Sequence, residues 1–278
     1  MNNKKILFIA SYPNSGNPFM RALVSSLIYS KDGIFNFGLF NHISLIDTNP
    51  FYDFVKIINE KDFFNLDNIA CSSKYWQLAQ KKSSELTPNF IFKTHAANLM
   101  YINKSYTSPE NCLGVIYIVR DPRSIVPSYS YHLNISEEDI FKIITNKKSI
   151  SLNPKENICV PLSSWDIHIK SWEMLKCPKI FIKFEDMVRD TKGTIKKCID
   201  FLKFLNLEFT CDNQKIENIY QSTKFNKLKK LEDISGYRIG KDKNFFRKGE
   251  IENDDLNQDI KNKLKLLFQD KMRELNYI

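Results

Sequence analysis

Short runs of apolar residues recur along the chain, and most are followed by a segment with apolar residues at helical spacing. Residues 6–10 form the first run, and the apolar positions from Phe19 to Ile28 recur at three- and four-residue intervals. The other runs are residues 89–92, 115–119 and 180–184, and the last two precede helical patterns over 125–131 and 195–205. Unbroken apolar runs interleaved with helices are typical of a parallel sheet covered on both faces. The pattern predicts an α/β fold.

Two other segments complete the predicted architecture. The residues from Asp255 to Asn276 place apolar side chains at helical spacing and predict a terminal amphipathic helix. Residues 31–88 are less regular and rich in aromatic residues, most of which we expect to pack in the core. Neither an internal repeat nor a linker rich in Pro, Gly and Ser divides the sequence, so we expect a single domain over residues 1–278.

The composition excludes several classes of protein. A hydrophobic share of 42% and a charged share of 26% are ordinary for a globular chain and exclude a disordered or collagen-like one. No apolar run approaches the roughly 18 residues of a membrane span. The run after Lys5 is too short for a secretory signal, so we expect a cytoplasmic protein. The six cysteines form no Cys-x-x-Cys unit, and we expect neither a metal site nor a disulfide framework.

Positive charge exceeds negative charge along the chain. There are 41 Lys and Arg against 32 Asp and Glu, a formal net charge of +9. Most of these cations lie close to acidic residues, but residues 224–230 and 238–248 are less balanced. Such clusters suit a polyanion or a phosphate ligand. They do not by themselves distinguish a nucleic acid from a nucleotide.

The residues that follow the predicted strands are the candidates for chemistry, because ligands bind beyond the carboxyl ends of parallel strands. Residues 11–17 form a turn of mostly small residues that opens into a helix, which presents backbone N–H groups to an anion. The turn lacks the Gly-x-x-x-x-Gly-Lys-Ser/Thr pattern of P-loop nucleotide hydrolases. On this evidence alone, a phosphate site and an ordinary strand-to-helix turn are equally compatible with the sequence.

Two more segments carry groups that can hold a phosphate. Arg120 directly follows the run 115–119, and its guanidinium can make two hydrogen bonds to a phosphate. Ser128 in the next helix can donate to the same group. An Arg-Asp ion pair at the start of a helix is the structural alternative. Residues 245–249 combine two cations with a glycine that permits close approach of backbone to an anion.

Taken together, six motifs resemble those of the cytosolic-type sulfotransferase family, and they occur in that family's order from about residue 5 to 250. They are residues 11–17, Lys93-Thr94-His95, Arg120 to Ser128, Ser164-Trp165 with His168 and Trp172, Phe184-Glu185-Asp186-Met187, and Phe246-Arg247-Lys248-Gly249. The resemblance implies a P-loop-like α/β fold and the sulfuryl donor 3′-phosphoadenosine 5′-phosphosulfate (PAPS).

The resemblance also implies a set of donor-binding residues. The 5′-phosphosulfate would be held by Asn14, Ser15, Gly16, Asn17 and Pro18, and the 3′-phosphate by Arg120, Ser128, Arg247, Lys248 and Gly249. Phe19 and Phe225 would lie against the adenine, with Thr223 hydrogen-bonding nearby and Phe184 where the family usually has a nucleotide-contacting Tyr. The two basic clusters identified from composition fall where the family holds its doubly charged nucleotide, with Arg247 and Lys248 in the second cluster and Phe225 within the first.

The resemblance makes His95 the candidate general base and Lys93 the candidate cation beside the transferred group. An imidazole titrates near neutrality and can accept the proton of an attacking hydroxyl. Asn14 stands where the family usually has Lys or Arg, and losing one such preorganised donor typically costs on the order of 10²–10³ in rate. Pro18 likewise replaces a hydroxyl residue, and His168 is expected to be a buried packing residue.

Three other functions compete with this sulfotransferase activity. A donor-binding protein with little catalysis stays open because of Asn14. Binding of nucleic acid ranks last because no aromatic platform or motif accompanies the basic clusters. A kinase or nucleotide hydrolase would need a loop Lys-Ser/Thr pair and is set aside. The expected acceptor is a small molecule or a glycan, with lipid, phenol, sugar and peptide all open, and a homodimer is one of the oligomeric states that the sequence leaves open.

Overall fold

The computed structural model describes residues 5–48, 51–52, 68–153, 158–237, 244, 246 and 256–278. A five-stranded sheet in the order β2-β3-β1-β6-β9 forms its centre, and every neighbouring pair is parallel. Its strands are β1 (Ile6–Ser11), β2 (Ile43–Leu45), β3 (Ile91–Thr94), β6 (Cys112–Val119) and β9 (Lys179–Lys183). Four of the five strands overlap the predicted apolar runs. The α/β fold with a covered parallel sheet is therefore confirmed.

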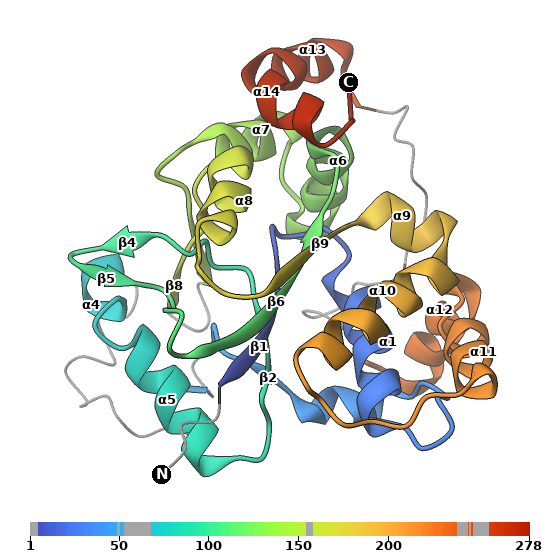
Figure 1. Cartoon of the computed structure of the whole chain (residues 1–278). Coiled ribbons are helices and arrows are strands. Elements are labelled where there is room, and N and C mark those ends of the chain that lie inside the picture. Colours follow the sequence, from blue (N-terminus) through green and yellow to red (C-terminus); the bar gives the residue numbers. More distant parts are fainter. Residues whose placement is uncertain are drawn as a thin grey trace.

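The remaining elements surround this sheet (Figure 1). The helices are α1 (Asn17–Tyr29), η1 (Phe37–His42), α4 (Ile69–Ser72), α5 (Trp76–Leu86), α6 (Pro122–Leu133), α7 (Glu137–Thr145), α8 (Trp165–Glu173), α9 (Phe184–Arg189), α10 (Thr191–Phe204), α11 (Asn213–Ser222), α12 (Phe225–Ser235), α13 (Gln258–Leu267) and α14 (Gln269–Glu274). Two small antiparallel hairpins pair β4 (Met100–Tyr101) with β5 (Lys104–Ser105), and β7 (Ile150–Asn153) with β8 (Ile158–Pro161).

Side chains alternate along each strand, so the sheet buries a separate core on each face. On one face, Leu7 and Ile9 of β1 pack with α1, α10, α11 and η1. On the other face, Phe8 and Ala10 pack with α5, α6, α8 and the two C-terminal helices. Figure 1 shows α1, α10, α11 and α12 gathered on one side of the sheet. Burial on both faces explains why the strands are continuously apolar in sequence.

The strand register brings the carboxyl ends of the central strands to one edge of the sheet. Ala10 is paired with Thr94, and Ser11 with Ile118. On the next pair, Val119 is opposite Lys183. The residues immediately after β1, β3, β6 and β9 therefore meet at this edge, which is where parallel sheets bind ligands.

The C-terminal prediction was wrong in one respect, because the expected single helix is two helices, α13 and α14. They are separated at Phe268, whose dihedrals (φ −109°, ψ 19°) are not helical. The Phe268 ring is buried, with its centroid 5.2 Å from that of Trp165. We attribute the break to this tertiary contact, which periodicity does not reveal.

The aromatic residues of the irregular segment divide into two groups. Phe51, Tyr52 and Trp76 are buried in the core, as expected. Phe54, Phe63 and Phe64 lie outside the described residues. In the described part of the chain, no helix has both the length and the apolar character needed to cross a membrane.

Candidate active site

The turn between β1 and α1 has a backbone that most residues cannot adopt. Asn14 and Gly16 both have positive φ, 60° and 94°. Asn tolerates this left-handed region better than most residues, and glycine enters it freely. A Cβ at Gly16 would also lie 2.3 Å from the Phe184 ring. Glycine is therefore required here both by conformation and by the close approach of Phe184.

Two buried polar atoms in this turn have no hydrogen-bond partner among the described residues. They are the Ser15 hydroxyl oxygen and the Asn17 side-chain oxygen Oδ1. The Asn17 amide nitrogen, by contrast, donates to the Ile9 carbonyl at 3.3 Å and to the Ser11 hydroxyl at 3.2 Å. Helix α1 also begins without a side-chain cap, and Pro18 occupies its first turn. A Ser15 hydroxyl at the start of this helix can donate to an anion, which fits a phosphate cradle.

Arg120, at the end of β6, is joined to this turn. Its guanidinium donates a hydrogen bond to the Asn14 carbonyl at 2.8 Å. The same guanidinium lies over the Phe184 ring, with Cζ 4.3 Å from the ring centroid. On the backbone side, Trp165 donates from Nε1 to the Arg120 carbonyl at 3.1 Å. Phe184 is thus held between Gly16 and Arg120, and it supports both.

Behind Arg120, a second network connects β6 and α9 with the C-terminus. Glu185 accepts a hydrogen bond from the Asp121 N–H at 3.1 Å and one from the Tyr277 hydroxyl at 2.9 Å. Asp121 caps α6 by accepting a hydrogen bond from the Arg123 backbone N–H. The Arg123 guanidinium donates to the Tyr277 carbonyl at 3.0 Å. Burial raises the pKa of Glu185. This network holds the strand end that carries Arg120, and its Tyr277 contact was not predicted.

His95 follows β3 and is joined to the end of β1. Its Nδ1 lies 2.9 Å from the Ser11 carbonyl oxygen and 3.3 Å from the Ser11 hydroxyl. Because a carbonyl can only accept, Nδ1 carries the proton and Nε2 carries the lone pair. Burial lowers the pKa of His95 well below 6.5, and the positive charge of Lys93 lowers it further. The ring is therefore neutral at pH 7 and can accept a proton at Nε2.

Asp47 positions the segment that carries His95, and no sequence pattern pointed to it. Its Oδ2 accepts hydrogen bonds from the Thr94 hydroxyl at 2.7 Å and from the His95 N–H at 3.2 Å. Its Oδ1 accepts from the Tyr106 hydroxyl at 2.7 Å. One carboxylate therefore fixes the chain on both sides of the Thr94–His95 peptide. The contact joins residues that are 48 positions apart, which explains why a local pattern could not reveal it.

His168 is buried, as expected, and contacts the backbone of His95. It is 0% exposed, and its Nε2 lies 2.9 Å from the His95 carbonyl oxygen. Its Nδ1 lies 2.7 Å from the Tyr117 hydroxyl. Because the carbonyl accepts from Nε2, Nδ1 is the acceptor for Tyr117. Burial lowers the pKa of His168 to about 4.

Arg21 is a second residue that the sequence did not single out. It lies one turn after Asn17 on α1 and is only 4% exposed. Its Cζ lies 4.0 Å from the centroid of the Phe40 ring, a cation–π contact. Its charge also contributes to the low pKa of His95. A lone Arg in an apolar helix pattern gives no signal of this role without the packing of η1.

The other predicted donor residues are described only in part. Phe19 is 6% exposed and packs in the core beside α1, and Phe225 begins α12 with its ring 5.7 Å from that of Phe246. Thr223 is buried and donates to the Ile219 carbonyl at 2.7 Å, and Ser128 lies half-buried on α6. Arg247, Lys248 and Gly249 lie outside the described residues. Asn14, Gly16, Arg120 and Phe184 are thus brought together, as are Lys93 and His95, whereas the contacts of these residues and of the 3′-phosphate set with the donor stay predictions.

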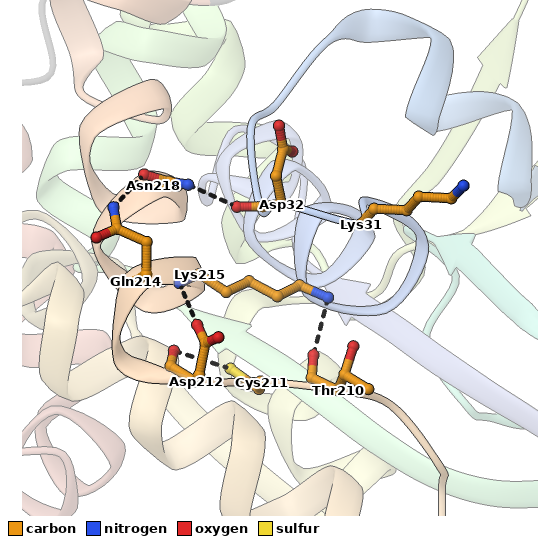
Figure 2. Close-up of a pocket in the computed structure, with 8 residues that line it drawn as sticks. All are labelled: Lys31, Asp32, Thr210, Cys211, Asp212, Gln214, Lys215 and Asn218. Carbon is orange, nitrogen blue, oxygen red and sulfur yellow. Dashed lines mark hydrogen bonds between the residues drawn. The ribbon is translucent and has the colours of Figure 1, made fainter.

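A small cavity lies at the far end of α1 from this site (Figure 2). Its volume is about 150 Å³, and it is lined by Lys31, Asp32, Thr210, Cys211, Asp212, Gln214, Lys215 and Asn218. Lys215 donates from Nζ to the Thr210 carbonyl at 2.9 Å, and Asp212 caps α11 by accepting from the Lys215 N–H. Thirteen helical residues separate the two ends of α1, about 20 Å at 1.5 Å per residue. The cavity is therefore separate from the candidate site.

Comparison with protein families matches this chain to one domain. The family model described as "Sulfotransferase domain" matches residues 4–276. Cytosolic sulfotransferase 5 of Arabidopsis thaliana is 24% identical over 283 residues, which cover 96% of this chain and 79% of that protein. Two further sulfotransferases, from Flaveria bidentis and Rattus norvegicus, are matched over 65% of their own length.

Solved structures are similar over almost the whole chain. A mouse sulfotransferase, SULT7A1, complexed with PAP has a TM-score of 0.61 at 19% identity, covering 97% of this chain and 85% of its own. A retinol dehydratase in a complex with retinol and PAP has a TM-score of 0.62 at 19% identity, covering 98% of this chain and 82% of its own. At this level of identity, the similarity establishes the shared fold.

Proposed function

Because this chain belongs to the sulfotransferase domain family, we propose that it transfers a sulfuryl group from PAPS to a hydroxyl, or less readily an amine, of an acceptor. The reaction would be an in-line displacement in which His95 serves as general base. The observation that carries the proposal is the hydrogen bond between His95 Nδ1 and the Ser11 carbonyl, 2.9 Å long. It holds a neutral imidazole beside the turn that would bind the donor.

The residues of the β1–α1 turn fit the phosphosulfate of the donor. Ser15 has a buried hydroxyl without a hydrogen-bond partner among the described residues. Gly16 brings backbone into a space that a side chain could not enter, since its Cβ would meet Phe184. Arg120 adds a positive charge at the same edge of the sheet, already oriented by Asn14 and Phe184. The donor, when bound, supplies an activated sulfuryl group with a bisphosphate leaving group.

We assign the proton transfer to His95 and the electrostatic role to Lys93. With Nδ1 donating to Ser11, Nε2 is the atom that would accept the proton of the acceptor hydroxyl. Lys93 lies on β3, which ends at Thr94 immediately before His95, and its charge adds to the effect of burial in lowering the pKa of His95. The Lys93 charge is also available to stabilise negative charge that develops on the transferred group.

The acceptor class belongs to the proposal as well. The retinol dehydratase of similar fold was solved with retinol and PAP, a small apolar alcohol and a nucleotide. We extend the small-molecule class to this chain and keep a glycan as the alternative acceptor. Any acceptor must present its hydroxyl or amine to Nε2 of His95.

A second candidate is a donor-binding protein with little catalysis. Asn14 favours it, because its amide carries no charge where the family usually has Lys or Arg. The positive φ of 60° is compatible with Asn and less so with Lys, so restoring the cation would strain this turn. A rise in turnover in Asn14→Lys, with unchanged affinity for the nucleotide, would favour the second candidate for the wild-type chain.

The test combines binding and turnover on the full chain. Titration calorimetry with adenosine 3′,5′-bisphosphate measures donor-site binding, and mass spectrometry of acceptor panels with PAPS detects a sulfated product. We expect binding by the wild type and by His95→Gln, but product only with the wild type. Binding without product from either protein would support the second candidate. An absence of binding at saturating nucleotide would reject both functions.

A further inference from the structure

Two cysteines at the opposite end of the sheet from the candidate site lie in contact. The sulfur atoms of Cys112 and Cys177 are 3.3 Å apart, and neither cysteine is part of a disulfide. Cys112 is the first residue of β6, and Cys177 precedes β9, the strand beside it. Sixty-five positions separate the two in sequence, so only the pairing of β6 with β9 brings them together.

The backbone around both cysteines is fixed by hydrogen bonds. Immediately after Cys177, the Pro178 carbonyl accepts from the Val115 N–H at 3.0 Å, which ties the two strands together. The Cys177 N–H donates to the Leu175 carbonyl at 2.9 Å. The two sulfurs therefore meet because the strands are paired, and not through a chance side-chain orientation. A disulfide needs sulfurs about 2.05 Å apart, and the two sulfurs here are 3.3 Å apart before any bond has formed.

The two thiols differ in exposure and in electrostatic surroundings. Cys112 is 2% exposed, whereas Cys177 is only partly buried. Cys112 donates its S–H to the Cys177 sulfur, and the charges of Lys179 and Lys5 lie nearby, so the pKa of Cys177 is lowered. The pKa of Cys112 is raised by the same hydrogen bond and by burial. Cys177 is thus the accessible nucleophile and Cys112 the buried partner.

We propose that Cys112 and Cys177 form a redox pair that closes into a disulfide on reaction with a hydroperoxide. The Cys177 thiolate attacks one peroxide oxygen, the O–O bond breaks, and a sulfenic acid forms as hydroxide leaves and takes up a proton to give water. The Cys112 sulfur then attacks the Cys177 sulfur, the S–O bond breaks, and the thiol proton leaves with the hydroxyl group as a second water. Each sulfur loses one electron, and the two peroxide oxygens together gain two.

The position of the pair predicts its effect. Eight residues of β6 separate Cys112 from Arg120, roughly 25 Å at about 3.3 Å per residue. The disulfide would close a loop that contains α6, α7 and α8, and closing a long loop restricts the unfolded chain. We expect oxidation to raise the thermal midpoint by roughly 5–10 °C and to change donor binding less than twofold.

The experiment titrates the reduced full-length protein with hydrogen peroxide at pH 7. Intact mass should fall by about 2 Da, and digestion without reductant should release one linked peptide pair containing Cys112 and Cys177. Dithiothreitol should restore the mass and the lower thermal midpoint. The variants Cys112→Ser and Cys177→Ser should show neither change. Cys198→Ser, another buried thiol, which lies 3.8 Å from the Met20 sulfur, is the matched control and should behave as the wild type.

Three outcomes would overturn the proposal. They are a linked peptide pair that contains other cysteines, a gain of about 32 Da at Cys177 in place of the loss of 2 Da, and formation of linked dimers instead of an intramolecular bond. If a serine variant fails to fold, wild-type protein equilibrated in glutathione buffers gives the same answer. The linked peptide pair should then appear and disappear reversibly with the buffer potential, and its absence at every potential would reject the pair.

Discussion

Arg120 donates a hydrogen bond of 2.8 Å to the backbone carbonyl of Asn14, a residue 106 positions earlier in the chain. The bond joins the carboxyl end of β6 to the turn between β1 and α1. The donor of this bond is a charged group and its acceptor is a backbone atom, so it constrains the turn whatever side chain stands at residue 14. The guanidinium Cζ also lies 4.3 Å from the centroid of the Phe184 ring, a cation–π contact.

Replacing Arg120 should therefore weaken nucleotide binding strongly. Arg120→Met removes the charged hydrogen bond that Arg120 would make to the nucleotide. Such a bond contributes about 1.5–3 kcal/mol, which corresponds to a roughly 10- to 150-fold higher dissociation constant for adenosine 3′,5′-bisphosphate. Titration calorimetry measures that constant. Arg189→Met, at an exposed position at the end of α9, should leave it unchanged. Equal effects of both substitutions would point to overall charge instead of this contact.

Gly16→Ala tests the close approach of the turn to Phe184. The alanine would have to adopt a positive φ, and its Cβ would lie 2.3 Å from the Phe184 ring. We therefore expect a loss of roughly 2–4 kcal/mol in the free energy of unfolding. Gly236→Ala is the matched control, because Gly236 also has positive φ (66°) but nothing within 4 Å of a Cβ. It should cost only about 1 kcal/mol. Urea unfolding of both variants measures the difference, and equal losses would show that the ring contact has no effect.

The parts of the fold that sequence predicts are those with a repeated local pattern. Four of the five strands overlap unbroken apolar runs, and the residues after them meet at one edge because parallel strands end together. β2 was missed because three residues, Ile43–Leu45, are too short for any periodicity. The break at Phe268 was missed because its cause is a contact with Trp165, about 100 positions away.

The candidate site follows the same rule. Motif resemblance led to Asn14, His95 and Arg120, and contacts between elements now join their segments. It did not lead to Asp47, whose importance comes from hydrogen bonds to Thr94 and His95 across the β2–β3 pair. A side chain that positions another residue does so through contacts that exist only in the folded chain. Residues of that kind are therefore the ones that a single sequence predicts least well.

Asp47→Asn tests whether that carboxylate positions His95. An amide offers one acceptor oxygen where the carboxylate accepts from Thr94 and His95 at one oxygen and from Tyr106 at the other. We expect kcat to fall roughly 10- to 100-fold as the base is displaced, with little change in donor affinity. Asp139→Asn, in an exposed pair with Lys142, is the control and should keep full activity. A change in donor affinity alone would contradict a role in positioning the base.

The pH dependence of turnover tests His95 and Lys93 together. Burial and the Lys93 charge lower the pKa of His95 well below 6.5, so the base is protonated, and activity lost, only in acid well below that value. Lys93→Met removes part of this effect, and the acid limb of kcat should move to higher pH. Lys170→Met, at an exposed position on α8, should leave the limb where it is. A limb that moves to lower pH, or is unchanged, in Lys93→Met would contradict the assignment.

His168 predicts how stability changes with pH. Its pKa is about 4 in the folded protein because of burial, against 6.5 for an ordinary His. Between these values the unfolded chain binds a proton that the folded chain does not, so the free energy of unfolding falls as the pH falls through this window. The loss from this group amounts to about 3 kcal/mol at pH 4, from 1.36 kcal/mol per pKa unit. It disappears as the pH rises above 6.5, where the unfolded chain also loses the proton.

The variant His168→Gln isolates that contribution. Its amide can still bond to the His95 carbonyl but does not titrate, so urea unfolding at pH 7.5 and pH 4.5 should give a smaller difference than in the wild type, by about 2–3 kcal/mol. His42→Gln, at an exposed position, is the control and should keep the wild-type difference. Because carboxylates contribute equally to all three proteins, only the gap between the variants reports on His168. An equal change in the free energy of unfolding between the two pH values in His168→Gln and the wild type would mean that protonation of this imidazole does not cause the loss of stability in acid.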